Sequence, residues 1–186
     1  MSIVTQWPDH LLTLADWDGL PEDSSRRFEL VEGVLGVTPR PILRHQSAGW
    51  RLAGQLEPQL PPELYVVTEA ELLIDAEGPA TVSVPDIMAV RGDLMDDDLA
   101  RATAADVPLA VEILSPGTRR TDRVTKFAEA GIDHYWLLDL DEPITLTAYR
   151  LVDGEYELVG EHTGKARLVL FDRPVIVDLP SLTRHR

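Results

Sequence analysis

Apolar positions in the N-terminal part of the chain switch between helical and strand-like spacing. Residues 8–17 and 43–59 have helical spacing, and the second segment is followed by two prolines that a helix cannot continue through. Between them, residues 28–37 alternate around a Glu-Gly pair and predict a β-hairpin. Four further apolar runs predict strands, at residues 64–68, 71–74, 83–90 and 109–114.

The C-terminal part of the chain predicts one more helix and several antiparallel strands. Residues 92–106 are polar and acidic, and they predict a loop with at most one helical turn. Residues 118–130 predict a helix capped by Gly131, followed by a buried strand at 134–139. Residues 144–178 alternate in period two and predict antiparallel strands. This order predicts a single α/β domain, residues 1–186, with a mixed sheet and helices packed on it.

Composition adds a class of protein to this picture. The 186 residues are 44% hydrophobic and 26% charged, as in an ordinary soluble globular domain. The chain has no cysteine, which excludes disulfides and thiolate metal sites. No apolar run has the length of a membrane span, and the first residues lack the pattern of a signal peptide. We therefore expect a cytoplasmic protein.

The formal net charge of −15 is unusual for a protein that binds nucleic acid. Duplex binding relies on Lys and Arg side chains that neutralise phosphates. Positive residues need only gather locally, however, and they do so at Arg119, Arg120, Arg123 and Lys126. A bound metal would also neutralise part of the acidic charge. The net charge therefore leaves nucleic-acid binding open.

Two acidic residues lie in or beside strand-like runs. Asp86 follows Pro85 at the start of one run, and Glu112 is enclosed by Val111 and Ile113. Burying a carboxylate is costly unless a metal or another cation offsets its charge. On adjacent strands, two carboxylates and a main-chain carbonyl such as that of Ile113 would suit Mg²⁺ or Mn²⁺. Taken singly, Asp86 would more simply cap a turn and Glu112 would pair with an arginine.

Lys126 follows Asp122 by four residues, so both side chains lie on one face of the predicted helix. The two side chains could form an ordinary ion pair. Alternatively, the lysine could reach the acidic site and stabilise charge on a phosphate. Arg119 and Arg123 would lie on or near the same face, where they could contact backbone phosphates. Both interpretations of Lys126 remain open from these residues.

Three other polar residues are candidates for chemistry. Glu29, in the predicted hairpin, is either a surface residue or a third acid. His45 begins the second helix and could contact a metal or a phosphate, or simply cap the helix. Ser115 lacks the surrounding Gly-x-Ser-x-Gly pattern, so the sequence does not support serine chemistry. The phosphate-cradling, dinucleotide-binding and zinc-protease motifs are also absent from the sequence.

With these residues assembled, the chain resembles the Uma2 family of restriction endonucleases, a branch of the PD-(D/E)XK nuclease superfamily. The resemblance covers roughly residues 10–180, through short motifs that keep a specific order and spacing. The motifs are Phe28-Glu29-Leu30-Val31-Glu32-Gly33, His45, Pro85-Asp86, Val111-Glu112-Ile113-Leu114-Ser115-Pro116, Arg120-Thr121-Asp122-Arg123 with Lys126, and Gly131-Ile132-Asp133-His134-Tyr135-Trp136.

This resemblance implies a restriction-endonuclease-like core, in which helices flank a mixed central sheet and the site lies at one end of the sheet. It implies Glu29, Asp86 and Glu112 as acidic, metal-binding residues. The superfamily usually places a lysine two residues after the second acid, where this chain has Leu114. The family pattern moves that lysine to the next helix, where it is Lys126. Here that helix lacks the family's usual tyrosine and is about one turn shorter.

The expected function is a Mg²⁺- or Mn²⁺-dependent endonuclease that hydrolyses DNA phosphodiester bonds with a metal-activated water. The resemblance also suggests a homodimer, with Tyr135 and Trp136 either at the interface or in the core. Two alternatives remain. One is a catalytically inactive nucleic-acid- or protein-binding module on the same fold. The other is a metal-dependent phosphodiesterase that acts on RNA or nucleotides.

Overall fold

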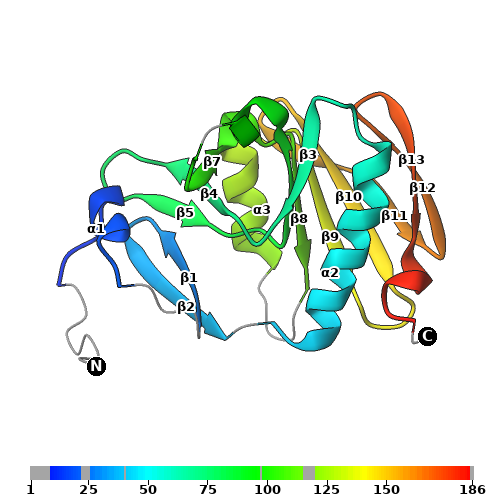
Figure 1. Ribbon diagram of the computed structural model, residues 1–186, viewed down its shortest axis with the longest axis horizontal. Coiled ribbons are helices and arrows are strands. Elements are labelled where there is room, and N and C mark those ends of the chain that lie inside the picture. The colour runs from blue at the N-terminus through cyan, green and yellow to red at the C-terminus, as the bar shows by residue number, and fades with distance from the viewer. Residues whose placement is uncertain (1–8, 22–25, 40, 97, 115–119, 185–186) are drawn as a thin grey trace.

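The strands of the protein form two main sheets and a separate hairpin (Figure 1). The computed structural model describes residues 9–21, 26–39, 41–96, 98–114 and 120–184. The smaller main sheet has the strand order β2-β1-β5-β4-β7, and the larger has the order β11-β10-β9-β8-β6-β3. Strands β12 and β13 pair with each other.

The smaller sheet comprises β1 (Arg26–Val31), β2 (Val34–Pro39), β4 (Glu71–Asp75), β5 (Thr81–Ser83) and β7 (Arg101–Thr103). The larger comprises β3 (Leu64–Thr68), β6 (Ile87–Arg91), β8 (Leu109–Ile113), β9 (His134–Asp139), β10 (Thr145–Val152) and β11 (Glu155–Thr163). The hairpin is β12 (Lys165–Leu170) and β13 (Arg173–Asp178). The helices are α1 (Leu14–Asp18), α2 (Leu43–Leu56) and α3 (Arg120–Glu129), with short 3₁₀ turns η1 (Glu57–Gln59), η2 (Gly92–Asp96), η3 (Ala104–Asp106) and η4 (Leu179–Leu182).

The larger sheet is mixed, because β8 and β9 run parallel while its other neighbouring strands run antiparallel. Helices cover both of its faces. Strand side chains alternate between faces, so Ile87 and Val111 pack with Leu52 of α2. Met88 and Ala110 pack with Phe127 of α3 on the other face. Each fully buried leucine or phenylalanine contributes about 1.5–3 kcal/mol. The predicted class, a mixed α/β sheet flanked by helices with antiparallel C-terminal strands, is confirmed.

Several elements differ in extent from the sequence-based predictions. The run at 83–90 is not one strand, because Pro85 has no N–H for a ladder and the chain changes sheet there, from β5 to β6. The segment at 92–106 contains β7, a strand too short for its pattern to be recognised. The first helix begins only at Leu14, where the Thr13 side chain caps it.

The two aromatic residues that could supply a dimer interface, Tyr135 and Trp136, lie in the core. Tyr135 and Trp136 are each 1% exposed and lie on opposite faces of the larger sheet, in its two apolar clusters. They are therefore core residues and cannot supply a surface for a second subunit. Within the described ranges, no helix has both the length and the apolar character needed to cross a membrane.

Two chain segments that connect the sheets lie side by side. One connects β3 to β4 through Glu69 and Ala70, and the other connects β5 to β6 through Val84, Pro85 and Asp86. The main-chain N–H of Glu69 donates a hydrogen bond to the Asp86 carbonyl, at 3.2 Å. This bond fixes Asp86 at the junction of the two sheets, within reach of residues from both.

Candidate active site

Asp86 is the most closely surrounded charged residue of this junction. Its side chain is 5% exposed. Oδ1 accepts a hydrogen bond from Nη1 of Arg27 on β1, at 2.8 Å. Oδ2 accepts one from the main-chain N–H of Ile113, at the end of β8, also at 2.8 Å. Nε2 of His45 lies 3.3 Å from the same Oδ2. The carboxylate thus connects the smaller sheet, the larger sheet and the start of α2.

The same contacts set the charge of Asp86 and the tautomer of His45. Burial alone would raise the pKa of Asp86, but the His45 hydrogen bond and the Arg27 charge outweigh it, so the pKa is lowered. For His45, burial would lower the pKa, but the contacts with Asp86 outweigh it and the pKa is raised. Nε2 of His45 lies between two acceptors, Asp86 Oδ2 and the Ile113 carbonyl at 3.1 Å, so Nε2 must carry a proton.

Arg27 uses only part of its guanidinium group. The side chain is 16% exposed, and Nη1 holds Asp86. Its Nε and Nη2 are buried and have no hydrogen-bond partner, and no other buried side-chain nitrogen or oxygen of the described residues lacks one. A buried donor without an acceptor costs about 1–3 kcal/mol. The structure therefore keeps an expensive, incompletely paired arginine beside its buried acid.

Glu112 lies opposite Asp86 in the strand register. Strands β6 and β8 are antiparallel and pair Ile87 with Val111, so the next step along both strands brings Asp86 level with Glu112. Glu112 is 6% exposed. Because Val111 and Ile113 pack toward α2, strand alternation directs Glu112 to the face that α3 covers.

Glu29 lies on β1 and contacts the segment that leads into Asp86. Its Oε1 accepts hydrogen bonds from the Ser83 hydroxyl at 3.3 Å and from the Val84 main-chain N–H at 3.2 Å. Strand alternation also places Glu29 on the same face of β1 as Arg27. Glu29 therefore holds the main chain of the segment that precedes Asp86.

Lys126 lies on α3 and pairs with the β1–β2 hairpin. Its Nζ lies 3.7 Å from Oε1 of Glu32, a side chain that is 80% exposed. The lysine itself is 22% exposed, and α3 covers the face of the sheet that carries Glu112. Arg119, and the side chains of Asp122 and Arg123, lie outside the described residues. Their predicted phosphate contacts and the Asp122–Lys126 pair stay predictions.

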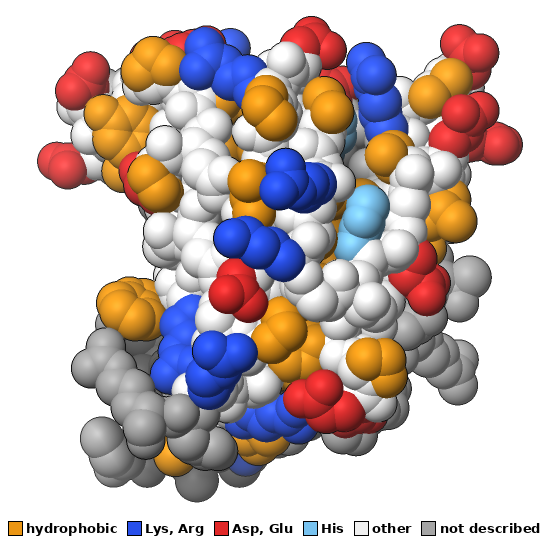
Figure 2. Space-filling view, turned by 90° about the vertical axis from the view of Figure 1, so that its right-hand side faces the viewer, with side chains coloured by type: hydrophobic (Ala, Val, Ile, Leu, Met, Phe, Trp, Pro, Cys, Tyr) orange, Lys and Arg blue, Asp and Glu red, His pale blue; other side chains and the backbone are white. Residues whose placement is uncertain are grey.

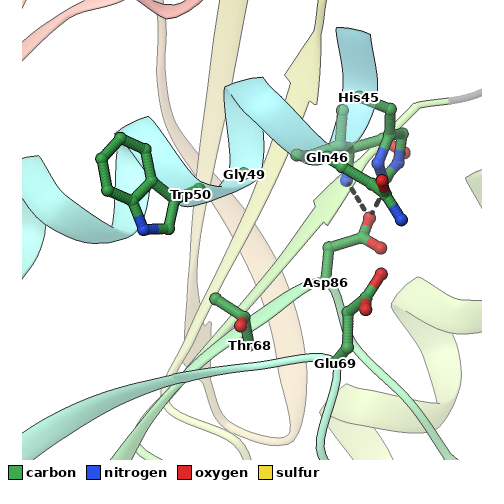
Figure 3. A pocket seen from close by; sticks show the side chains of 8 residues that line it. His45, Gln46, Gly49, Trp50, Thr68, Glu69 and Asp86 are labelled. Carbon is green, nitrogen blue, oxygen red and sulfur yellow. Dashed lines mark hydrogen bonds and ion pairs between the residues drawn. The ribbon is translucent and has the colours of Figure 1, made fainter. Parts of the chain in front are cut away.

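A pocket of about 120 Å³ opens beside Asp86 (Figure 3). Residues from α2, from the ends of β3 and β8 and from both connecting segments line it: His45, Gln46, Gly49, Trp50, Thr68, Glu69, Asp86 and Ile113. Figure 3 shows the carboxylates of Asp86 and Glu69 on the same side of the pocket, with Trp50 further along α2. Trp50 is 76% exposed. Glu69 has a positive φ of 52°, which an L-residue adopts only with strain.

The chemistry of the donor groups suits a hard divalent cation. Asp86, Glu112 and the Ile113 carbonyl offer oxygen atoms, which Mg²⁺ and Mn²⁺ prefer. Among the residues with described positions, however, no three His, Asp or Glu side chains gather closely enough to hold a metal ion. Both oxygens of Asp86 also accept hydrogen bonds from the protein. Glu112 is not among the residues that line the pocket beside Asp86, so a cation held by both carboxylates stays a prediction.

Two residues of this site were not selected from the sequence. Arg27 had a usable signal, because it lies two residues before Glu29 and alternation puts both on one face. Glu69 had none, because the run Val66-Val67-Thr68-Glu69-Ala70 reads as an ordinary strand and turn. Only the three-dimensional arrangement of the connecting segments brings Glu69 to the Asp86 pocket.

Comparison with known proteins gives a family and a fold. The model of the Uma2 family, described as "Putative restriction endonuclease", matches residues 11–172. A crystal structure titled as a "putative nuclease belonging to DUF820" from Anabaena variabilis superposes with a TM-score of 0.71, at 21% identity, over 92% of this chain and 97% of that one. No curated protein matches the chain. Because the family model covers most of its length, the chain belongs to the Uma2 family of restriction-endonuclease-like proteins.

Proposed function

We propose that this protein is a cytoplasmic Mg²⁺- or Mn²⁺-dependent endonuclease that hydrolyses DNA phosphodiester bonds with Asp86 at the centre of its active site. The observation that carries the proposal is Asp86 itself, a buried carboxylate at a sheet junction and level with a second buried acid. Such a carboxylate is expensive to bury. Its position on the fold of a nuclease family supports a catalytic use for it.

In this proposal, Asp86 and Glu112 hold the metal, and Glu29 acts as a further ligand or orders the segment before Asp86. A bound Mg²⁺ or Mn²⁺ would lower the pKa of a water and neutralise charge on the scissile phosphate. Lys126 would orient the attacking water or stabilise the developing negative charge. His45 holds Asp86 through Nε2–H and keeps its carboxylate ionised.

Two features of the surface support a nucleic-acid substrate despite the net charge of −15. Lys165, Arg167, Arg173 and Arg184 are exposed on the side of the molecule that carries β12 and β13. In Figure 2, Lys and Arg side chains run down the middle of this side, with most acidic side chains nearer its edges. Trp50, exposed beside the Asp86 pocket, offers a face on which an unpaired base can stack.

The direct test is DNA cleavage by the purified protein with Mg²⁺ or Mn²⁺. We expect Asp86→Ala and Lys126→Ala to abolish cleavage. Asp141→Ala and Arg150→Ala, which change an exposed acid and an exposed cation outside this basic set, serve as controls and should retain it. Cleavage that survives Asp86→Ala would refute the mechanism. RNA and dinucleotide substrates in the same assay distinguish the alternative of a phosphodiesterase acting on RNA or nucleotides.

A catalytically inactive binding module is the second candidate, and one observation favours it. Arg27 already neutralises Asp86, so the buried carboxylate has a counter-charge without a metal. Calorimetric titration with Mn²⁺ separates the two candidates: binding that Asp86→Ala removes supports the endonuclease, and no binding at millimolar Mn²⁺ supports the inactive module. The homodimer implied by the family resemblance stays a prediction, to be measured by sedimentation.

A further inference from the structure

We propose that Arg27 is a phosphate-binding residue of this site, with one nitrogen holding Asp86 and the opposite edge of its guanidinium receiving a phosphate. The inference rests on the proposed function, because it assumes that Asp86 acts on a phosphodiester. The observation behind it is the incomplete pairing of Arg27. Nη1 donates to Asp86 Oδ1 at 2.8 Å, whereas Nε and Nη2 are buried and have no partner.

The two unpartnered nitrogens are not an arbitrary pair. The Nε–H and one Nη2–H of a guanidinium point the same way along one planar edge, and this edge matches two oxygens of a phosphate or carboxylate. Arginine is the side chain that offers such a two-point contact, whereas lysine offers a point charge. Buried donors in native proteins nearly always have partners. An edge with two empty donors therefore indicates an oxyanion that is bound during function.

The position of Arg27 suits a phosphate that reacts at Asp86. Arg27 lies near the start of β1, opposite Thr38 of β2, and reaches across to the segment that connects the two sheets. A phosphate on its free edge would lie one guanidinium width from the Asp86 carboxylate. Since both nitrogens are shielded from solvent, the guanidinium must turn about its Asp86 contact, or the start of β1 must shift, before the phosphate binds.

The decisive variant is Arg27→Lys. A lysine keeps the positive charge beside Asp86 but loses the two-donor edge. We expect wild-type protein to bind inorganic phosphate in calorimetric titration with chelator present. Arg27→Lys should bind it at least about tenfold more weakly, since a lost hydrogen bond to a charged group is worth that much. Arg26→Lys changes the exposed neighbour on the same strand and should bind as wild type does. Equal phosphate affinity in wild type and Arg27→Lys, or no phosphate binding by wild type, would overturn the inference.

A second pair of variants keeps the test valid if Arg27→Lys does not fold. In an Asp86→Asn background the carboxylate charge is gone, so Arg27 is no longer needed to neutralise it. The Asp86→Asn variant is compared with the double variant Asp86→Asn, Arg27→Lys. A phosphate affinity that is still about tenfold lower in the double variant supports direct binding by Arg27. Unchanged affinity between these two proteins would show that Arg27 serves only as a counter-charge.

The choice of probe distinguishes a phosphate of a nucleic-acid backbone from a free phosphate or nucleotide. Duplex DNA and inorganic phosphate are each titrated with chelator present, so that cleavage does not interfere. Affinity for both that depends on Arg27 assigns the phosphate to a nucleic-acid backbone, and dependence for inorganic phosphate alone assigns a free phosphate or nucleotide. Metal-dependent DNA cleavage is measured separately. Absence of cleavage with Arg27-dependent phosphate binding refutes the proposed function alone, whereas cleavage with phosphate binding independent of Arg27 refutes this inference alone.

Discussion

The two charged residues on which the proposed chemistry depends most, Asp86 and Lys126, lie in opposite environments. Asp86 is 5% exposed and is held by Arg27, His45 and the main chain of Ile113. Lys126 is 22% exposed and lies 3.7 Å from Glu32, which is itself mostly exposed. Folding thus positions the acid through several buried contacts. It holds the lysine by a surface ion pair of a kind that contributes little and exchanges easily.

The strongest test of this contrast is to remove the cation in each environment, Arg27 beside Asp86 and Lys126 beside Glu32. Arg27→Met leaves Asp86 buried without its counter-charge, and breaking such a pair costs about 3–5 kcal/mol. We expect a value near 3 kcal/mol, at the lower end of that range, because two unsatisfied donors leave with the arginine. Lys126→Met should cost less than about 1 kcal/mol. Urea unfolding with chelator present measures both.

The control for this comparison is Arg26→Met, an exposed position on the same strand, which should leave the free energy of unfolding nearly unchanged. Similar losses at Arg27 and Lys126 would contradict the contrast. They would mean that Lys126 is as firmly built into the folded protein as the cation at Asp86.

A second test uses pH, because His45 contributes to holding Asp86 and its pKa is raised in the folded protein. A group whose pKa rises on folding stabilises fully below its unfolded value, near pH 6.5, and the stabilisation is lost as pH rises through the folded value. The difference in stability between wild type and a His45 variant should therefore shrink above pH 6.5. His45→Gln should lose about 1–3 kcal/mol at low pH, where the hydrogen-bonded charge matters most, and less at high pH.

The measurement is urea unfolding across this pH range with chelator present. His162→Gln removes a histidine on β11, at the edge of the larger sheet, and serves as the control, which should keep the slope of wild type. A pH dependence that is identical in wild type and His45→Gln would show that the imidazole does not stabilise the carboxylate.

The same contrast separates what the sequence could and could not predict. Local patterns were sufficient for the β1–β2 hairpin, where Glu32 and Gly33 adopt the positive φ values of a tight turn. They were also sufficient to place Asp86 and Glu112 in or beside neighbouring strands, where both are buried, whereas their catalytic roles stay a proposal. Arg27 was missed because its contact with Asp86 spans 59 residues and joins two sheets. Its neighbour Glu29 was selected, and strand alternation from Glu29 would have led to it.

The division into two sheets could not be predicted from hydrophobic spacing. Residues 83–90 are mostly apolar, so the hydrophobic pattern does not show that the chain leaves one sheet at Ser83 and enters another at Ile87. Pro85 is the one local clue, because it cannot donate to a ladder. The position of Glu69 could not be predicted for the same reason. Its positive φ accompanies a main-chain hydrogen bond to the Asp86 carbonyl, which forms only where the two connecting segments meet.

A third prediction concerns this strained residue, at the pocket's edge. Glu69→Gly should stabilise the protein by about 0.5–1 kcal/mol, because glycine adopts a positive φ without the penalty of a side chain. Glu69→Ala removes the same carboxylate but keeps the strain, and it should give no such gain. Thermal unfolding of the two variants measures the difference. A gain in both would assign the effect to the carboxylate charge near Asp86 rather than to the backbone.

The smallest expected effect is at the other end of the comparison, on the partner of Lys126. Glu32→Gln removes the charge that holds the lysine ammonium while keeping the shape of the side chain in the turn. Stability should change by less than about 0.5 kcal/mol, as is usual for exposed pairs. If Glu32 competes with substrate for Lys126, metal-dependent cleavage should rise by at most about twofold, which is the rate equivalent of about 0.5 kcal/mol. Glu129→Gln, an exposed position on the same helix, should leave the rate unchanged. A fall in rate toward that of Lys126→Ala would reverse the interpretation, because Glu32 would then orient the lysine for catalysis instead of withholding it.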